Sequence, residues 1–273
     1  MIEVVERVLG SPVELELLKT KPGRRTVRAR GPRGVAIVKQ YSSKRAPVVA
    51  GRVFALADGP AEPVVPQVLE LDAGHRVVVL TDVPGEPLRH ALLAGDVDTC
   101  RRAGAALAAW HGHWRDAAPP PLREHTIVDE VAILDERAAG APASIGRVVR
   151  AATTPLATGW SCRTVVHRDL YEEQLLVGEH VGLIDLDDAA LGPPELDVGN
   201  LLAHGELLAL RAGDNLAPML AAILDGYAAT NGATLDPGLL ERCRRLTLLR
   251  LACIHADDRL PDLGARPAPY AST

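Results

Sequence analysis

The stretch of sequence that decides the fold is VVHRDLYEEQLLVGEHVGLID, residues 165–185. Asp169 stands two residues after His167, Gln174 follows five residues later, and Asp185 ends a second apolar run. A carboxylate can accept the proton of a hydroxyl group, and amide and carboxylate oxygens are hard ligands of the kind that Mg²⁺ binds. The order of these side chains therefore predicts a site of phosphoryl transfer, with Asp169 as catalytic base and with Gln174 and Asp185 as metal ligands.

The local structure expected here explains how these residues could meet. Segment 175–185 is expected to form a small hairpin whose turn holds Gly178, and its two strands would bring Gln174 and Asp185 close together. His167 is expected to fix the loop that carries the catalytic base by hydrogen bonding.

The composition is that of a globular protein. The chain has 273 residues, of which 47% are hydrophobic and 24% charged, which suits one large domain or two lobes. It has no apolar run of roughly eighteen residues and no signal-peptide pattern, so we expect no membrane span and a cytoplasmic location. The four cysteines form no C-x-x-C pair, and His111 and His113 would point apart on a helix, so neither set predicts a metal site.

Charge is unevenly distributed along the chain. Residues 1–52 contain twelve Lys and Arg and four acidic residues, whereas the whole chain carries a net charge of −5. A basic first segment suits a polyanionic ligand, although a solvated basic hairpin would give the same count. Aromatic residues make up only 3% and are not interleaved with basic ones, so no nucleic-acid surface is predicted.

The first part of the chain is expected to form a small antiparallel sheet. Five apolar runs are separated by turn residues such as KPG and GPRG, which is typical of strands linked by hairpins. We expect these strands at residues 13–20, 24–31, 34–41, 66–73 and 75–83, with one helix at 46–58. The Pro- and Gly-containing segment 83–88 is the natural hinge between an N-terminal lobe, 1–82, and a C-terminal lobe, 89–273.

After the hinge the pattern becomes helical, because good helix formers and apolar residues recur at helical spacing. The expected helices lie at 96–114, 127–139, 143–157, 195–213, 216–232 and 237–260. Short strand-like runs interrupt them at 164–166, 174–177 and 181–186, and residues 261–273 are expected to form a loose tail. The expected fold class is therefore α+β.

Lys39 is one of only four lysines among thirty basic residues, and it lies in the apolar strand GVAIVKQY. Strand alternation puts it on the same face as Val35 and Ile37, where a charge needs an anionic partner or a route to water. A lysine that reaches nucleotide phosphates fits this position, although snorkelling at a strand end would also explain it.

Residues 164–204 resemble the aminoglycoside phosphotransferase and choline-kinase-type branch of the protein-kinase-like superfamily. The family pattern of a His-x-Asp loop, an Ile-Asp metal site, Gly-x-Pro and a helix-opening Asp is matched by His167, Asp169, Asp185, Gly192, Pro193 and Asp197. The similarity spans about residues 13–255 and is stronger in the second lobe. It implies a bilobal kinase-like fold that transfers phosphoryl groups from ATP or GTP with Mg²⁺.

The resemblance also implies roles for individual residues. It makes Asp169 the catalytic base, with His167 in the same loop, and it makes residues 81–84 the part of the chain that meets the adenine base. The residues expected to bind the nucleotide or the metal are Lys39, Thr81, Asp82, Val83, Gln174 and Asp185.

Three departures from the family pattern stand out. Gln174 replaces Asn, which keeps the amide oxygen but adds a methylene group. A G-x-G-x-x-G loop is missing, since TKPGRRTV contains only Gly23, and this fits the branch better than it fits protein kinases. The helix at 46–58 has no Glu for Lys39, so either Asp58 or another acid pairs with it, or the first lobe aligns differently.

The segment after the metal site indicates the kind of acceptor. Only eleven residues separate Asp185 from Asp197, which is expected to cap a helix, and this leaves no room for the activation segment of a protein kinase. A small-molecule hydroxyl acceptor is therefore expected. An acceptor that carries an amine, such as an aminosugar, is favoured by nearby acids, although neutral sugars remain an alternative. These acids are Glu172, Glu173, Asp187, Asp188 and Glu195, with Glu206 further along the chain.

The predicted function is thus ATP- and Mg²⁺-dependent phosphorylation of a hydroxyl group on an aminoglycoside, an aminosugar or a sugar. A catalytically weak or inactive nucleotide-binding regulator with the same fold is the alternative. It is motivated by Gln174 and by the missing helix Glu.

Overall fold

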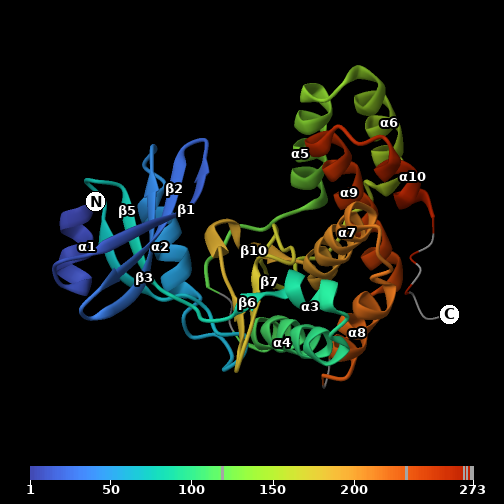
Figure 1. Ribbon diagram of the computed structural model, residues 1–273. Helices are drawn as coiled ribbons and strands as arrows, with labels where there is room; N and C mark the ends of the chain where they lie inside the picture. Colours follow the sequence, from blue (N-terminus) through green and yellow to red (C-terminus); the bar gives the residue numbers. More distant parts are fainter. Residues whose placement is uncertain (118–119, 231–232, 267, 269, 271–273) are drawn as a thin grey trace.

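The computed structural model describes residues 1–117, 120–230, 233–266, 268 and 270 of the chain. It has two lobes, one built on a sheet and a larger one that is mainly helical (Figure 1). The chain passes between them after Thr81 and reaches the first strand of the second lobe at Glu86. The predicted α+β fold with a small sheet-bearing lobe and a larger helical lobe is confirmed.

The N-terminal lobe is built on five strands in which every pair of neighbours is antiparallel. The KPG turn between the first two strands contains Gly23 with a φ of 79°, a conformation that glycine adopts without strain. All five strands lie within two residues of their predicted ranges. In spatial order they are β1 (Glu14–Lys21), β2 (Arg24–Gly31), β3 (Gly34–Tyr41), β5 (Val77–Thr81) and β4 (Val68–Asp72).

Two helices cover this sheet, one on each face. Helix α1 (Ile2–Leu9) packs its buried side chains against Val38 and Val79, whereas α2 (Ala46–Ala55) packs on the side of Val78 and Leu80. The sequence predicted only one helix in this lobe, so α1 is a correction. A helix of two turns is stabilised by tertiary packing rather than by its own propensity, and its signal in the sequence is correspondingly weak.

The C-terminal lobe contains eight α-helices among the described residues, and most lie close to the predicted ranges. Helix α3 was not predicted, and the range expected as one helix at 237–260 forms two, separated where Ala256 adopts a left-handed φ of 50°. The second of these occupies part of the expected loose tail, and positions 231–232, 267, 269 and 271–273 lie outside the described residues. The helices are α3 (Leu88–Ala94), α4 (Val97–Asp116), α5 (Ile127–Gly140), α6 (Ala143–Thr153), α7 (Pro194–Ala212), α8 (Ala217–Ala228), α9 (Pro237–His255) and α10 (Arg259–Ala265).

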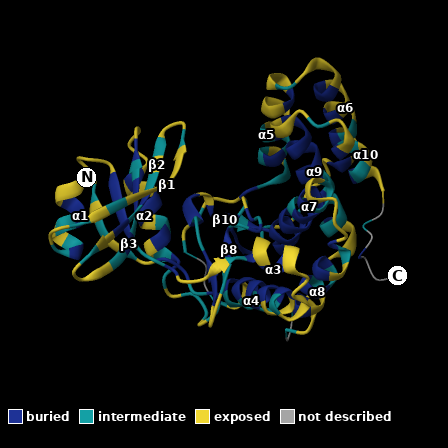
Figure 2. Cartoon of the chain, viewed as in Figure 1, coloured by how far each residue is buried: buried dark blue, intermediate teal, exposed yellow. Residues whose placement is uncertain are grey.

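The core of this lobe lies where α4, α7 and α8 meet, and buried residues gather there (Figure 2). Helices α4 and α8 approach so closely that a Cβ atom on Gly104 would lie 1.9 Å from the carbonyl oxygen of Ile223. A Cβ atom on Gly226 would lie equally close, 1.9 Å from the carbonyl oxygen of Arg101. Both glycines are therefore required by the packing. Among the described residues, no helix combines the length and the apolar character that a membrane span needs.

Two small sheets connect the helices and carry the motif residues. Strand β7 (Thr164–Val166) pairs with β10 (Ala190–Gly192), and β8 (Leu175–Val177) lies between β6 (Glu86–Pro87) and β9 (Val181–Leu183). The hairpin predicted from the sequence is confirmed, with Gly178 in its turn. Its pairing continues one step further, because the Ile184 amide donates to the Gln174 carbonyl at 3.0 Å. This brings Gln174 to the end of the hairpin at which Asp185 follows.

Candidate active site

The loop after β7 carries Asp169 and is fixed by Asp197, a fully buried residue of α7. The Asp197 carboxylate accepts hydrogen bonds from the backbone amides of His167 at 2.6 Å and of Arg168 at 2.8 Å. Arg168 has a left-handed φ of 73°, which is unfavourable for a residue with a side chain unless its surroundings hold it. The prediction that Asp197 caps a helix is wrong, because α7 already begins at Pro194 and the carboxylate points to the loop instead.

His167 ties this loop to the segment that carries the second motif aspartate. Its Nε2 lies 2.7 Å from the carbonyl oxygen of Ile184. A carbonyl oxygen only accepts hydrogen bonds, so Nε2 carries the proton and donates. The ring is buried, which means that His167 positions the loop rather than facing a cavity. The expected hydrogen-bonding role of His167 is confirmed.

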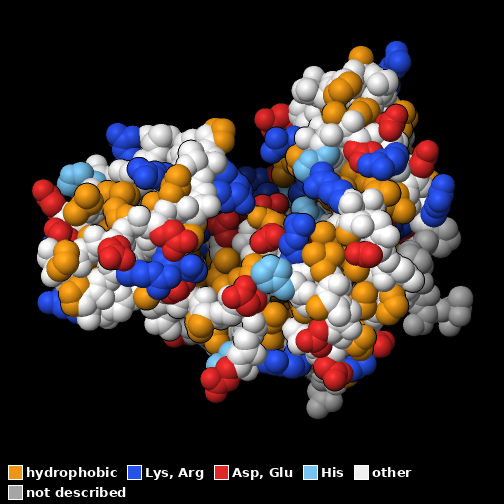
Figure 3. Space-filling view, viewed as in Figure 1, with side chains coloured by type: hydrophobic (Ala, Val, Ile, Leu, Met, Phe, Trp, Pro, Cys, Tyr) orange, Lys and Arg blue, Asp and Glu red, His pale blue; other side chains and the backbone are white. Residues whose placement is uncertain are grey.

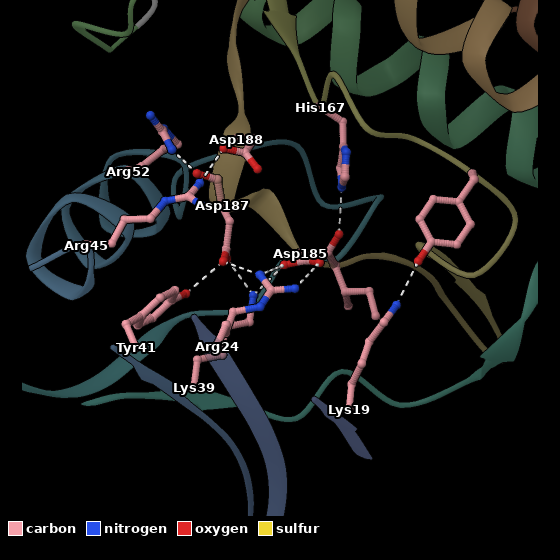
Figure 4. A network of polar contacts seen from close by, with 12 residues as sticks. Lys19, Arg24, Lys39, Tyr41, Arg45, Arg52, His167, Asp185, Asp187 and Asp188 are labelled. Atoms are coloured by element: carbon pink, nitrogen blue, oxygen red, sulfur yellow. Dashed lines mark hydrogen bonds and ion pairs between the residues drawn. The ribbon is translucent and has the colours of Figure 1, made fainter. Parts of the chain in front are cut away.

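Asp185 follows β9 in a left-handed conformation with a φ of 63° and projects toward the N-terminal lobe. Its Oδ1 accepts from Lys39 Nζ at 2.7 Å and from Arg24 Nη1 at 3.0 Å, while its Oδ2 accepts from Arg24 Nη2 at 3.1 Å (Figure 4). Burial alone would raise the pKa of this carboxyl group, but Lys39 and Arg24 outweigh it and hold the pKa well below its usual value. Asp185 is therefore ionised and is engaged from both of its oxygens.

The acid that pairs with Lys39 lies in the C-terminal lobe, together with Asp185. Lys39 Nζ lies 2.5 Å from Asp187 Oδ1, and the Tyr41 hydroxyl donates to Asp187 Oδ2 at 2.7 Å. Burial, and then the charge of Asp187, raise the pKa of Tyr41, so its hydroxyl stays protonated and can donate. Asp58 is exposed, and the residue that α2 directs to this network is Arg52, which donates to the Asp187 carbonyl oxygen. Asp187 was predicted to face the acceptor, and its burial within the lysine network corrects this.

Two adjoining cavities open between the lobes, where acidic and basic side chains gather in the hollow of the surface (Figure 3). The larger has a volume of about 450 Å³, and Asp185 belongs to its lining and to that of the smaller, which has a volume of about 200 Å³. Asp169 lies on the wall of the smaller cavity. All residues predicted to bind nucleotide or metal line the larger one, namely Lys39, Thr81, Asp82, Val83, Gln174 and Asp185.

The donor atoms at the junction of the cavities suit a metal that arrives with phosphate groups. Gln174 is only 4% exposed, yet it lines the larger cavity together with Asp185, so an amide and a carboxylate group share this wall. In the part of the chain that the structure describes, no three His, Cys, Asp or Glu side chains form a metal-binding group. Mg²⁺ commonly binds through one or two protein oxygens and completes its shell with water and phosphate. These residues therefore fit Mg²⁺.

The remaining acids predicted for the acceptor have different surroundings. Asp188 lines the smaller cavity and pairs with Arg45 at the surface, and Glu173 lines the larger one with Arg89 Nη1 at 3.6 Å. Glu172 is buried, which raises its pKa, and it lines neither cavity.

Glu206 is not brought to the site. It is buried, receives two hydrogen bonds from Arg244 at 2.8 and 3.0 Å, and accepts another from the Tyr270 hydroxyl. This set of contacts joins α7, α9 and the end of the chain, so the predicted substrate contact of Glu206 is corrected to a structural one.

Sequence reasoning missed three members of the polar network. Tyr41 could have been found, since it lies two residues after Lys39 and strand alternation puts both on one face. Arg24 and Arg52 belong to the basic first segment, but their sequence positions carry no signal for contacts with residues about 160 and 135 positions away.

A lysine on an inward strand face, a cavity between two lobes and a braced His-x-Asp loop define a phosphotransferase of the protein-kinase-like class. The model of the APH family, described as the phosphotransferase enzyme family, matches residues 23–237. The chain belongs to this family, and it is a small-molecule kinase. The resemblance seen in the sequence is therefore confirmed.

Solved structures of such kinases share the fold. An aminoglycoside phosphotransferase from Streptomyces rimosus is 17% identical with a TM-score of 0.65, and the match covers 91% of this chain and 97% of that one. A choline kinase from Cryptosporidium parvum is 10% identical, with a TM-score of 0.64 and coverage of 97% and 91%. A spectinomycin phosphotransferase in complex with ADP and spectinomycin is 14% identical, with a TM-score of 0.60 and coverage of 99% and 89%. No curated protein sequence matches the chain.

Proposed function

We propose that this kinase transfers the γ-phosphoryl group of ATP, bound with Mg²⁺, to a hydroxyl group of a small molecule such as an aminoglycoside, an aminosugar or a sugar. The observation that carries the proposal is the lining of the two cavities. Lys39, the residues after β5, Gln174 and Asp185 share the larger cavity, and Asp169 stands in the adjoining one. The spectinomycin phosphotransferase of the same fold binds ADP, which supports a purine nucleotide in this cavity.

When bound, the metal and nucleotide supply the activated phosphoryl group and neutralise part of its charge. Thr81, Asp82 and Val83, which line the larger cavity where the chain passes between the lobes, hold the adenine base of the nucleotide. Lys39 offers a positive charge to the phosphates, and Gln174 and Asp185 hold the metal. These side chains position and stabilise, and none of them reacts covalently.

Asp169 carries the proton chemistry. Its carboxylate is exposed and lines the smaller cavity, where it can orient an acceptor hydroxyl and take its proton. Asp197 keeps that carboxylate in place through the amides of His167 and Arg168. The acceptor would thus approach from the side of the smaller cavity, where Asp169 lies.

Few acids near the cavities are free to favour a positively charged acceptor. Asp187 and Glu206 are committed to ion pairs within the protein, and Asp188 and Glu173 each have an arginine partner. The preference for an amine-bearing acceptor therefore rests mainly on Asp169, and a neutral polyhydroxyl compound fits the same cavity.

The test is acceptor-dependent release of ADP from Mg-ATP, followed for a panel of aminoglycosides, aminosugars, sugars and amino alcohols. With a productive acceptor, Asp169→Asn should lower turnover by about 10²- to 10⁴-fold and leave Mg-ATP binding largely intact. Asp225→Asn, at an exposed position on α8, is the control. Turnover retained in Asp169→Asn would contradict the base role. If ATP raises the melting temperature but no acceptor raises turnover, the nucleotide-binding regulator becomes the better description.

A further inference from the structure

Arg24 occupies an unusual place for a cation in this site. It is the first residue of β2, directly after the turn at Gly23, and its side chain is only 14% exposed. Its guanidinium group donates to both oxygens of Asp185 and to Asp187, and Arg24 lines both cavities (Figure 4). The planar guanidinium group of Arg24 is thus held where the two cavities meet, between the proposed metal ligands and the proposed catalytic base, Asp169.

This contact opposes metal coordination by the same oxygens. Asp185 Oδ1 is shared by Lys39 and Arg24, and Oδ2 is engaged by Arg24 at 3.1 Å. A cation that binds Asp185 Oδ2 would share this oxygen with the guanidinium group at contact distance, where the two positive charges repel each other. Arg24 and a metal ion therefore compete for Asp185.

The displaced side chain has one obvious anionic partner. Arg24 projects into the junction of the two cavities from the start of β2, and the turn before it lacks a glycine-rich loop. In protein kinases such a loop covers the phosphates of the nucleotide. A guanidinium group forms paired hydrogen bonds with phosphate oxygens as readily as with a carboxylate. Arg25, the next residue on the strand, is exposed and lines neither cavity.

We propose that Arg24 is a phosphate-binding residue that exchanges partners: it holds Asp185 and Asp187 until metal and nucleotide bind, and then contacts the phosphate groups of the nucleotide. This inference rests on the proposed function, since it assumes that the larger cavity binds a nucleotide. Arg24 would then contact the phosphates that a glycine-rich loop covers in protein kinases.

The exchange predicts opposite effects on two ligands when the charge is removed. In Arg24→Gln, Mn²⁺ alone should bind at least about fivefold more tightly, because a cation at contact distance no longer competes. The affinity for Mn-ADP should fall about tenfold or more, as expected for loss of a charge-assisted hydrogen bond. Arg25→Gln should change neither constant. Electron paramagnetic resonance of free Mn²⁺ and isothermal titration of Mn-ADP measure the two constants, and a melting curve verifies the fold.

Each outcome decides the matter. Unchanged constants in a folded Arg24→Gln protein, or weaker binding of Mn²⁺, would overturn the exchange, and so would tighter Mn²⁺ with unaltered Mn-ADP affinity. If Arg24→Gln does not fold, Arg24→Lys retains a charge but loses the fork. It should then shift both constants in the same directions by smaller factors, and no shift overturns the proposal. A wild-type protein that binds no Mn-ADP would instead refute the proposed function itself.

Discussion

Replacing Asp197 by alanine should loosen the catalytic loop and destabilise the whole lobe. The substitution leaves the buried amides of His167 and Arg168 without an acceptor, and an unsatisfied buried donor costs about 1–3 kcal/mol. Two donors give about 2–6 kcal/mol, a large part of the roughly 5–15 kcal/mol that stabilises a typical protein. Asp197→Asn keeps one acceptor oxygen and presents an amide group to the other donor, so its effect should be about half as large.

Urea unfolding at neutral pH measures the total effect, and hydrogen exchange of the two amides measures the local one. Both amides should exchange much faster in Asp197→Ala than in the wild type, even under conditions where the protein stays folded. Asp225→Ala, an exposed position on α8, should remain within about 0.5 kcal/mol of the wild type. An Asp197→Ala protein that loses less than about 1 kcal/mol and keeps slow exchange would refute the account of the loop.

Three further changes test the packing, the metal site and the ion pairs. Gly104→Ala should destabilise the protein by about 1–3 kcal/mol or more in urea, because its Cβ meets the backbone of α8. Gly112→Ala on the same helix should be neutral or stabilising, because its Cβ meets only the end of the Arg115 side chain, at a contact distance of 3.8 Å. Gln174→Asn restores the family residue and should preserve or raise both activity and Mn²⁺ retention, and a folded, inactive variant would count against its role as a ligand. Burial raises the pKa of Asp185, but Lys39 and Arg24 lower it by more, so its pKa in the folded protein lies below the unfolded value of about 4. The ion pairs of Asp185 therefore stabilise the protein fully above pH ~4, and this stabilisation is lost as the pH falls toward the lower folded pKa. The loss of stability between pH 6 and pH 3 should accordingly be smaller in Asp185→Asn, and an equal loss would contradict this.

The sequence was sufficient for the elements that depend on short-range patterns. The hairpin turns KPG and GPRG and the alternation of apolar residues predicted the five strands, and the spacing of His167, Asp169 and Asp185 predicted the order of the motif. The hairpin around Gly178 joins residues that are few positions apart, so its register could be derived from the turn alone.

The residues that escaped prediction depend on contacts between distant parts of the chain. Asp197 looked like a helix cap because caps are local, whereas its true partners are amides about 30 residues away. Glu206 seemed close to the site in sequence, but one turn of helix decides which way a side chain points, and it points to Arg244. Periodicity contains no information about such pairings, and therefore the acids near the motif could be named but not placed.

The charge network of this site has a consequence for how the lobes hold together. In the family pattern a helix Glu within the N-terminal lobe pairs with the lysine, whereas here Lys39 pairs with Asp185 and Asp187 of the other lobe. Arg52 of α2 also crosses to the carbonyl oxygen of Asp187. The ion pairs that hold Lys39 in position therefore also connect the two lobes. A ligand that draws Lys39 and Arg24 toward phosphate weakens these links and must replace them by its own contacts with both lobes. A nucleotide that binds as proposed would therefore couple its own binding to the relative position of the lobes through the same few charges.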